Sequence, residues 1–100
     1  MTRYRIRIST RAWRELEAAS RWWLQHRDKA PGAFEEDVDA ALKLLRSNAF
    51  MGEPVGASRR QVRRIWLDRI RYFIYYRLLN DDVIEISTIR HGARGSRPRL

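Results

Sequence analysis

Arginine and aromatic residues stand close together in the second half of the chain, and their types and spacing are suited to binding. Phe73 and Tyr75 lie two residues apart in an apolar-rich segment, and Trp66 precedes them. Guanidinium groups bond to phosphate or carboxylate oxygens, and aromatic rings stack on bases. The alternative is a face covered by the tail or by a partner chain, with solvated arginines around it. We expect the surface that binds an anionic target or nucleic acid to contain Arg64, Arg71, Phe73, Arg77, Arg90, His91, Arg94 and Arg97.

Residues for acid–base or metal chemistry are scarce. The chain has no cysteine, and its two histidines, His26 and His91, lie far apart in the sequence. No pair of histidines or carboxylates has the spacing of a metal-binding motif. Arginine stabilises negative charge but scarcely titrates, so it is a poor general base. The sequence therefore predicts no metal site and no cofactor, and it assigns no catalytic residue.

An alternating segment must position the arginines and the rings. Residues 71–78 alternate with period two and are rich in aromatic and β-branched types, which is typical of a strand that contains both Arg71 and Arg77. Val62 to Leu67 and Val83 to Ile89 have similar composition, and turn-forming residues separate the three runs at 68–69 and 80–82. We predict three consecutive antiparallel strands. The face toward the helices should hold Tyr72, Ile74, Tyr76 and Leu78, and the open face should hold Trp66, Phe73 and Tyr75.

The N-terminal half is expected to cover one face of this sheet. Alternation from Tyr4 to Ile8 predicts a strand that joins the sheet. A helix should begin at Ser9 or Thr10, whose side-chain oxygen can cap it, and end near His26. A second helix should hold Pro31 in its first turn, and residues 47–60 should form a loop. The apolar stripes toward the sheet are Ala12, Leu16, Ala19 and Trp23, and then Phe34, Val38, Ala41, Leu42 and Leu45.

These elements predict an α+β fold with an N-terminal strand, a two-helix hairpin on one face of the sheet, and a three-strand antiparallel meander. One hundred residues suit one domain, 1–100, with a basic and flexible tail at 92–100. Twenty-one Arg and Lys against 12 Asp and Glu give a net charge of +9, which favours anionic partners. The N-terminus has neither the apolar run of a signal peptide nor that of a membrane span. We therefore expect a soluble, cytoplasmic protein.

The order of these elements, and the motifs within them, resemble a known family over nearly the whole chain. The motifs are Ser9-Thr10 followed by Ala12 and Leu16, the Phe34/Val38/Leu42 helix, Gly52 and Pro54, Val62-Arg63-Arg64-Ile65, Tyr72-Phe73-Ile74-Tyr75-Tyr76-Arg77, and His91-Gly92-Ala93-Arg94. In this order they resemble the RelE/ParE superfamily of bacterial toxins from toxin–antitoxin modules, and they look closest to its ParE branch.

The two branches imply different functions. RelE-type members are ribosome-dependent messenger-RNA nucleases that use basic residues on the open face and a tyrosine near the C-terminus. Here Trp66 and Phe73 stand at two of the basic positions, and Leu100 stands where the tyrosine is expected. If the chain is a nuclease, its candidate catalytic residues are Arg64, Arg94 and His91. ParE-type members poison DNA gyrase without catalytic residues of their own. The resemblance implies a gyrase inhibitor; the alternatives are an mRNA endoribonuclease and a non-toxic nucleic-acid-binding protein.

Both branches pair with a neutralising antitoxin, which is typically acidic. The chain has more large aromatic residues than a core of this size requires, and exposed apolar area of this kind marks an interaction surface. A strongly basic protein attracts an acidic chain that folds onto it. For Trp22, the alternative is a structural position at the edge of the helix hairpin. We expect the antitoxin to contact Trp13, Trp22, Trp66, Phe73 and Tyr75.

Overall fold

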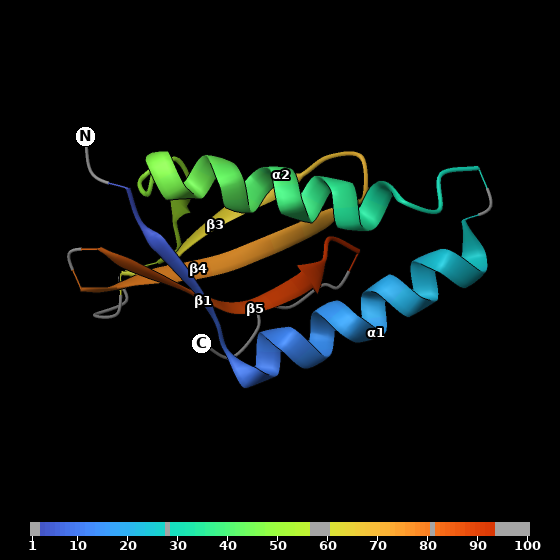
Figure 1. Ribbon diagram of the computed structural model, residues 1–100, viewed down its shortest axis with the longest axis horizontal. Coiled ribbons are helices and arrows are strands. Elements are labelled where there is room, and N and C mark those ends of the chain that lie inside the picture. Colours follow the sequence, from blue (N-terminus) through green and yellow to red (C-terminus); the bar gives the residue numbers. More distant parts are fainter. Residues whose placement is uncertain (1–2, 28, 57–60, 81, 94–100) are drawn as a thin grey trace.

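The protein, described by a computed structural model, consists of one five-stranded sheet and two helices (Figure 1). The structure describes residues 3–27, 29–56, 61–80 and 82–93. The elements in chain order are β1 (Arg5–Ile8), α1 (Thr10–His26), α2 (Ala33–Ser47), β2 (Glu53–Pro54), β3 (Arg63–Leu67), β4 (Tyr72–Asn80) and β5 (Val83–His91). The predicted α+β class and the predicted order of elements are confirmed. Most of the predicted tail, including Arg94 and Arg97, lies outside the described residues.

The strand order in the sheet is β1-β5-β4-β3-β2. Strands β3, β4 and β5 form the predicted antiparallel meander, whereas β1 pairs in parallel with β5, as Ile6 opposite Ile84 illustrates. The prediction of a plain loop at 47–60 was wrong in part, because Glu53 and Pro54 pair with β3 as the short strand β2. Only two residues pair there, and such a short strand leaves no alternating pattern in the sequence.

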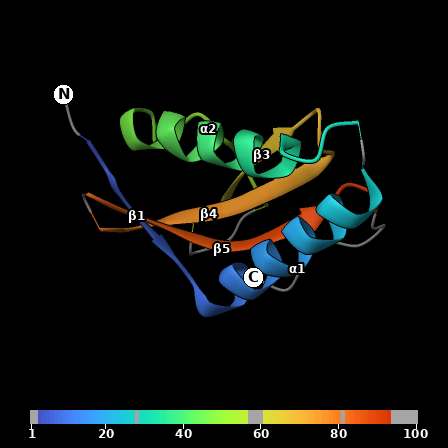
Figure 2. The same cartoon turned by 45° about the vertical axis from the view of Figure 1, so that its right-hand side comes forward.

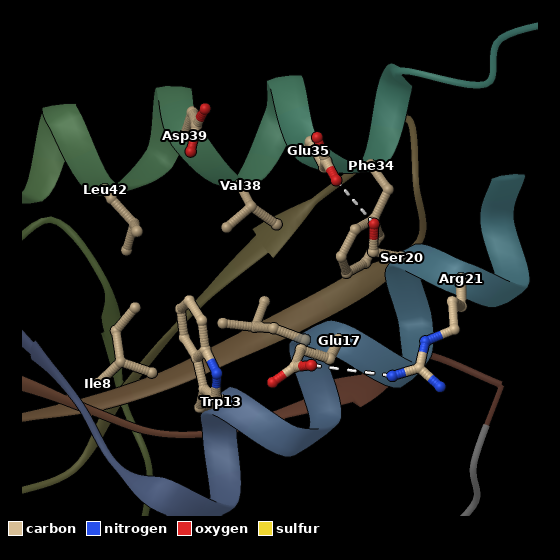
Figure 3. A pocket seen from close by; sticks show the side chains of 11 residues that line it. Ile8, Trp13, Glu17, Ser20, Arg21, Phe34, Glu35, Val38, Asp39 and Leu42 are labelled. Atoms are coloured by element: carbon tan, nitrogen blue, oxygen red, sulfur yellow. Dashed lines mark hydrogen bonds and ion pairs between the residues drawn. The ribbon is translucent and has the colours of Figure 1, made fainter.

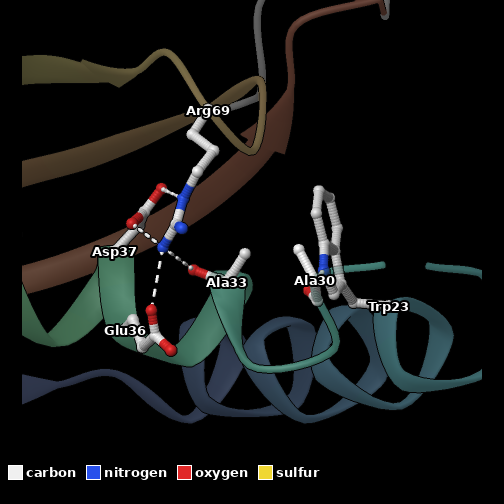
Figure 4. Close-up of polar contacts among 6 residues, drawn as sticks. All are labelled: Trp23, Ala30, Ala33, Glu36, Asp37 and Arg69. Atoms are coloured by element: carbon white, nitrogen blue, oxygen red, sulfur yellow. Dashed lines mark hydrogen bonds and ion pairs between the residues drawn. The ribbon is translucent and has the colours of Figure 1, made fainter. Parts of the chain in front are cut away.

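Both helices bury the stripes that their sequences predict. Ser9 caps α1, since its side-chain oxygen accepts the backbone N–H of Ala12 at 3.0 Å. The second helix begins at Ala33 and not around Pro31, so that part of the prediction was wrong. The carbonyl oxygen of Ala30 accepts both the indole N–H of Trp23 at 2.7 Å and the backbone N–H of Ala33 at 3.1 Å. These two bonds hold residues 30–33 in a turn that precedes the helix (Figure 4).

The two helices occupy different places on the same side of the sheet. Helix α2 lies over the strands, and α1 runs beside β5 (Figures 1 and 2). One core cluster joins Ala19 and Trp23 of α1 to residues of α2 and the sheet. Glu15 of α1 reaches the edge of β5, where its carboxylate accepts the hydroxyl of Thr88 at 2.6 Å and the backbone N–H of Ile89 at 3.2 Å. The carboxylate therefore accepts a backbone N–H at the edge of β5 that would otherwise bond to a neighbouring strand.

A guanidinium group fastens α2 to the turn between β3 and β4. Arg69 donates two hydrogen bonds to Asp37, at 2.6 and 3.1 Å, and a third to Glu36 at 3.1 Å (Figure 4). The bonds to Asp37 are the largest cause that raises the pKa of Arg69 above its ordinary value. The turn extends to Arg71, whose φ of 63° lies in the left-handed region. Arg71 was predicted within the strand, and this assignment was wrong, because the chain must reverse there before β4 begins.

The predicted register of β4 is confirmed, and it separates two faces. Ile74 and Tyr76 belong to the core beneath the helices, with Tyr72 and Leu78 packed against it. Tyr75 lies on the other face in a small cluster with Val55 and Val62, and Phe73 packs against that cluster. In the part of the chain that the structure describes, neither helix is long and apolar enough to cross a membrane.

Candidate binding surfaces

The open face of the sheet carries a row of three aromatic rings. Trp66 of β3 lies directly opposite Phe73 of β4, and their ring centroids are 4.7 Å apart. Tyr75 follows on the same face, with its centroid 6.1 Å from that of Phe73. Cross-strand and next-but-one neighbours share one face of a sheet, so β3 and β4 bring together the rings that the sequence predicted. We call Trp66, Phe73 and Tyr75 the aromatic row.

The members of the aromatic row differ in exposure. The side chain of Trp66 is 37% exposed and Phe73 is half-buried, but Tyr75 is only 2% exposed. Val55 and Val62 bury the ring of Tyr75. The expectation that Tyr75 presents its ring to a partner is therefore wrong, because residues from another segment of the chain already cover it. The sequence predicted the face of the sheet on which this ring lies, but it did not show that Val55 and Val62 cover the ring.

Arginines lie against the rings, and each also has an acidic partner. The guanidinium carbon of Arg64 is 4.2 Å from the ring centroid of Phe73, and that of Arg71 is 4.9 Å from the ring of Trp66. Arg64 also pairs with Glu53 of β2 at 2.5 Å, and Arg71 pairs with Asp68 at 3.3 Å. The hydrogen bonds to Tyr75 and Glu53 raise the pKa of Arg64 above its ordinary value. Arg64 therefore stays protonated, and the charges of both guanidinium groups are partly balanced within the chain.

Two further arginines of the predicted surface lie on β4 and β5. Arg77 pairs with Glu85 at 3.1 Å, and the side chain of Glu85 is largely buried. Arg90 lies opposite Phe73 and is partly buried. Arg94 and Arg97 lie outside the described residues. The sheet thus brings Arg64, Phe73, Arg77 and Arg90 to one face, with Arg71 at its rim.

Gly92 explains why Trp66 can lie over the end of β5. A Cβ atom at this position would come within 2.6 Å of the indole ring, a distance that side chains do not tolerate. Its backbone N–H donates to the carbonyl of Arg71 at 2.8 Å, which fixes the end of β5 against the turn. The sequence showed the His91-Gly92 pair, but no local signal revealed the ring that packs against the glycine.

His91 does not join the arginines of the open face. It lies opposite Tyr72, with the ring centroids 5.2 Å apart, and Tyr72 faces the helices. Its Nδ1 atom accepts the backbone N–H of Ala93 at 3.1 Å. Two of the three nuclease candidates, Arg64 and His91, thus lie on opposite faces of the sheet, and the third lies outside the described residues. Among the described residues, no group of three His, Asp or Glu side chains could hold a metal ion.

A groove of about 400 Å³ separates α1 from α2 (Figure 3). We call it the helix groove. Its walls are apolar: Trp13 rises from α1, and Val38 and Leu42 point down from α2 (Figure 3). The side chain of Trp13 is 54% exposed, although it is among the largest apolar side chains of the chain. The acidic groups Glu17, Glu35 and Asp39 also line this groove.

Trp22 lines a different surface from Trp13. A cleft of about 540 Å³ lies between α1 and the end of β5, and its lining includes Trp22, Arg27, Tyr72 and His91. The ring of Trp22 is 44% exposed and stacks on His26 at 4.6 Å. The five aromatic residues predicted to contact an antitoxin are therefore distributed over three surfaces: the helix groove, this cleft and the open face.

Two comparisons relate this fold to known proteins. A family model described as "ParE toxin of type II toxin-antitoxin system, parDE" matches residues 6–95. A solved structure entitled "Chromosomal ParDE TA system from P. aeruginosa" has a TM-score of 0.69 and 21% sequence identity, and the alignment covers 88% of this chain and 95% of that chain. No curated protein matches. The chain is thus an α+β protein whose N-terminal strand, two helices and five-stranded sheet match the ParE-like fold of that structure. It belongs to the ParE toxin family of type II toxin–antitoxin systems.

Proposed function

We propose that this ParE-family toxin inhibits DNA gyrase by binding to it, and that a cognate antitoxin neutralises the toxin. Membership of the ParE family carries the proposal. The arrangement of the open face supports a binding function over catalysis. A ribonuclease needs a general base for the 2′-hydroxyl and a group that stabilises the leaving oxygen. Arg64 serves only the second need, and His91 lies on the opposite face of the sheet.

The open face is the surface that we assign to the target. It combines a half-buried aromatic ring, Phe73, with a more exposed one, Trp66, and with Arg64 and Arg71 against them. Tryptophan and arginine are enriched among residues that dominate binding energy at protein interfaces. The rings are held in place by cross-strand packing, so little conformational entropy is lost when a partner covers them.

The experiment is a supercoiling assay with purified gyrase, run beside an in-vitro translation assay with mapping of messenger-RNA ends. We expect loss of supercoiling without codon-positioned cleavage. Arg71→Ala should weaken inhibition, because the exposed guanidinium lies at the rim of the face. Arg14→Ala removes the same charge from an exposed position on α1 and serves as the control. Cleavage at codons with supercoiling intact would instead identify a ribosome-dependent nuclease.

The antitoxin is proposed to be an acidic chain that folds onto the toxin. The net charge of +9 favours capture of such a partner, and an attraction between opposite charges weakens as salt increases. Co-purification with the product of the neighbouring reading frame, followed by titration with salt, measures this. A complex whose affinity does not change with salt would contradict the electrostatic part of the proposal.

A further inference from the structure

We propose that a second copy of this chain binds at the seam between α2 and β3, with the two α2 helices antiparallel. Four apolar side chains form what we call the seam patch: Leu44 of α2, Phe50 and Met51 of the segment that follows α2, and Trp66 of β3. Three observations support the inference, namely the exposure of this patch, the local balance of charge and the reversal of charge along α2. The inference does not depend on the proposed function.

The seam patch holds four of the seven large apolar side chains that are exposed among the described residues. Leu44 is 57% exposed and Phe50 is 58% exposed, and the values for Met51 and Trp66 are 40% and 37%. A hollow of about 280 Å³ lies between α2 and β3, and its lining includes Leu44, Met51 and Trp66 together with Ala40. Phe50 adjoins Met51 in the chain. Apolar surface that is gathered in this way is typical of an interaction site.

The charged groups that line this hollow are already balanced within the chain. Asp37 pairs with Arg69 at 2.6 Å (Figure 4), and Asp68 pairs with Arg71 at 3.3 Å. A nucleic acid or a strongly acidic protein therefore gains little from charge at this place, although the whole chain has a net charge of +9. An apolar and locally neutral surface suits another surface of the same kind, and a second copy of the chain supplies one.

Helix α2 reverses its charge along its length. Its first half holds four carboxylates, and its second half holds a lysine and an arginine. Glu36, Ala40 and Lys43 follow one another at steps of four and three residues, so they share one exposed side of the helix beside Leu44. Glu36 accepts a hydrogen bond from Arg69 at 3.1 Å through one of its two carboxylate oxygens (Figure 4). The exposed side of α2 thus has an acidic end, a small residue in the middle and a basic end.

A two-fold axis near Ala40 makes this side of the helix complementary to itself. When two antiparallel α2 helices have their Ala40 residues opposite one another, Glu36 of one copy lies beside Lys43 of the other, and the symmetry repeats the pair. Parallel helices would instead place Glu36 against Glu36, at an energetic cost. The small side chain of Ala40 permits a close approach, and Leu44 of each copy then lies against the hollow of the other.

The size of the seam patch limits the strength of the dimer. If each of its four side chains loses on the order of 100 Å² of accessible surface, the two copies together bury on the order of 800 Å² there. This is about half of a standard interface of roughly 1,600 Å², and the polar residues along α2 add to it. We therefore expect a weak dimer, with a dissociation constant on the order of 10 μM.

Sedimentation equilibrium of the full chain measures the dimer over about 1–200 μM, a range that brackets such a constant. Leu44→Ala should weaken dimerisation by about tenfold, because the two-fold symmetry removes two contacts with one substitution. Leu24→Ala truncates a 55% exposed leucine of α1 and should not change dimerisation. Circular dichroism checks that each variant is folded.

A pair of charge reversals tests the antiparallel arrangement. Lys43→Glu should weaken dimerisation by about fivefold, because two ion pairs become two repulsions. Lys29→Glu makes the same change of charge at an exposed position outside the seam patch and should cause no such loss. Adding Glu36→Lys to Lys43→Glu reverses both partners and should restore dimerisation, while Asp37 still holds Arg69 in place.

Several outcomes would overturn the inference. A chain that stays monomeric over the whole range of concentration would reject the dimer. A dimer that ignores both Leu44→Ala and Lys43→Glu would lie at another surface, and one that Trp13→Ala abolishes instead would lie at the helix groove. A double variant that does not regain dimerisation would reject the antiparallel pairing of the α2 helices. The supercoiling assay measures the proposed function separately, so neither result decides the other.

Discussion

The open face and the helix groove both contain aromatic rings, but the two surfaces differ in how far the rest of the chain covers the rings and pairs the charges. On the open face, Val55 and Val62 bury Tyr75, and Arg64 bridges Phe73, Tyr75 and Glu53. In the groove, Trp13 stays half-exposed and Asp39 has no ion-pair partner among the described residues. The difference indicates where each set of residues acts. Changes to the buried residues that support the open face should reduce folding stability, whereas changes at the exposed wall of the groove should leave the fold intact.

The largest effect is expected at Gly52, which lies in the segment that supports the open face. An added Cβ atom would come within 2.6 Å of the Tyr76 hydroxyl and 2.8 Å of the backbone oxygen of Arg64. Because one of these neighbours is backbone and the other is a buried side chain, the clash cannot be relieved cheaply. We expect Gly52→Ala to lower the free energy of unfolding by about 2–3 kcal/mol, measured by urea denaturation.

Gly32→Ala is the matched control for this substitution. There the new Cβ atom meets only the flexible carboxylate of Glu36, at 3.1 Å, so the change should stay within about 0.5 kcal/mol. Equal stabilities of the two variants would contradict the claim that the segment around Gly52 is tightly packed against β3 and β4.

A smaller effect is expected at Tyr76, whose hydroxyl links β4 to the segment before β2. It accepts the N–H of Gly52 at 2.9 Å and donates to the carbonyl of Ala49 at 2.8 Å. Tyr76→Phe leaves both groups without this partner and should cost about 1–2 kcal/mol at pH 7. Urea denaturation of both proteins measures the difference.

The pH dependence of this difference provides a second check. Burial raises the pKa of Tyr76 above its ordinary value, so the folded state favours the protonated phenol. Its contribution to stability is fully present below the pKa of the unfolded chain, about 10, and is lost as the pH rises through the higher folded value. The stability gap between the wild type and Tyr76→Phe should therefore narrow above about pH 10. A gap that stays constant to pH 11 would contradict a raised pKa.

Sequence reasoning succeeded where a regular pattern sets the structure. Period-two alternation fixed the faces of β4, and helical spacing fixed the buried stripes, which contain Trp23 and Phe34. These patterns repeat over many residues, so a local exception does not change the assignment. The family resemblance also followed from the order of the elements, and the family match confirms it.

The sequence did not reveal features that depend on contacts between distant segments. Val55 and Val62 cover Tyr75, Trp66 packs on Gly92, and Glu15 caps the edge of β5, each across a long separation in the chain. No local signal encodes such contacts. The acidic rim of the helix groove was hidden for a similar reason: carboxylates near the start of a helix are explained by the helix dipole, and only the fold shows that they surround an apolar groove.

The smallest change in stability is expected at Trp13, and it tests the comparison most directly. A tryptophan that belonged to the core would support several kcal/mol of stability, because truncation of buried aromatic residues costs about 3–5 kcal/mol. Trp13 instead keeps 54% of its surface exposed, so Trp13→Ala should lower the free energy of unfolding by less than about 1 kcal/mol. The same variant should bind the cognate antitoxin more weakly, since the ring forms one wall of the groove and is among the residues expected to contact the antitoxin. Urea denaturation and a binding titration with the antitoxin, on one preparation of the toxin, give both values. A loss of stability above about 2 kcal/mol would place Trp13 in the core, and the groove would then be part of the folded interior rather than a site that awaits a partner.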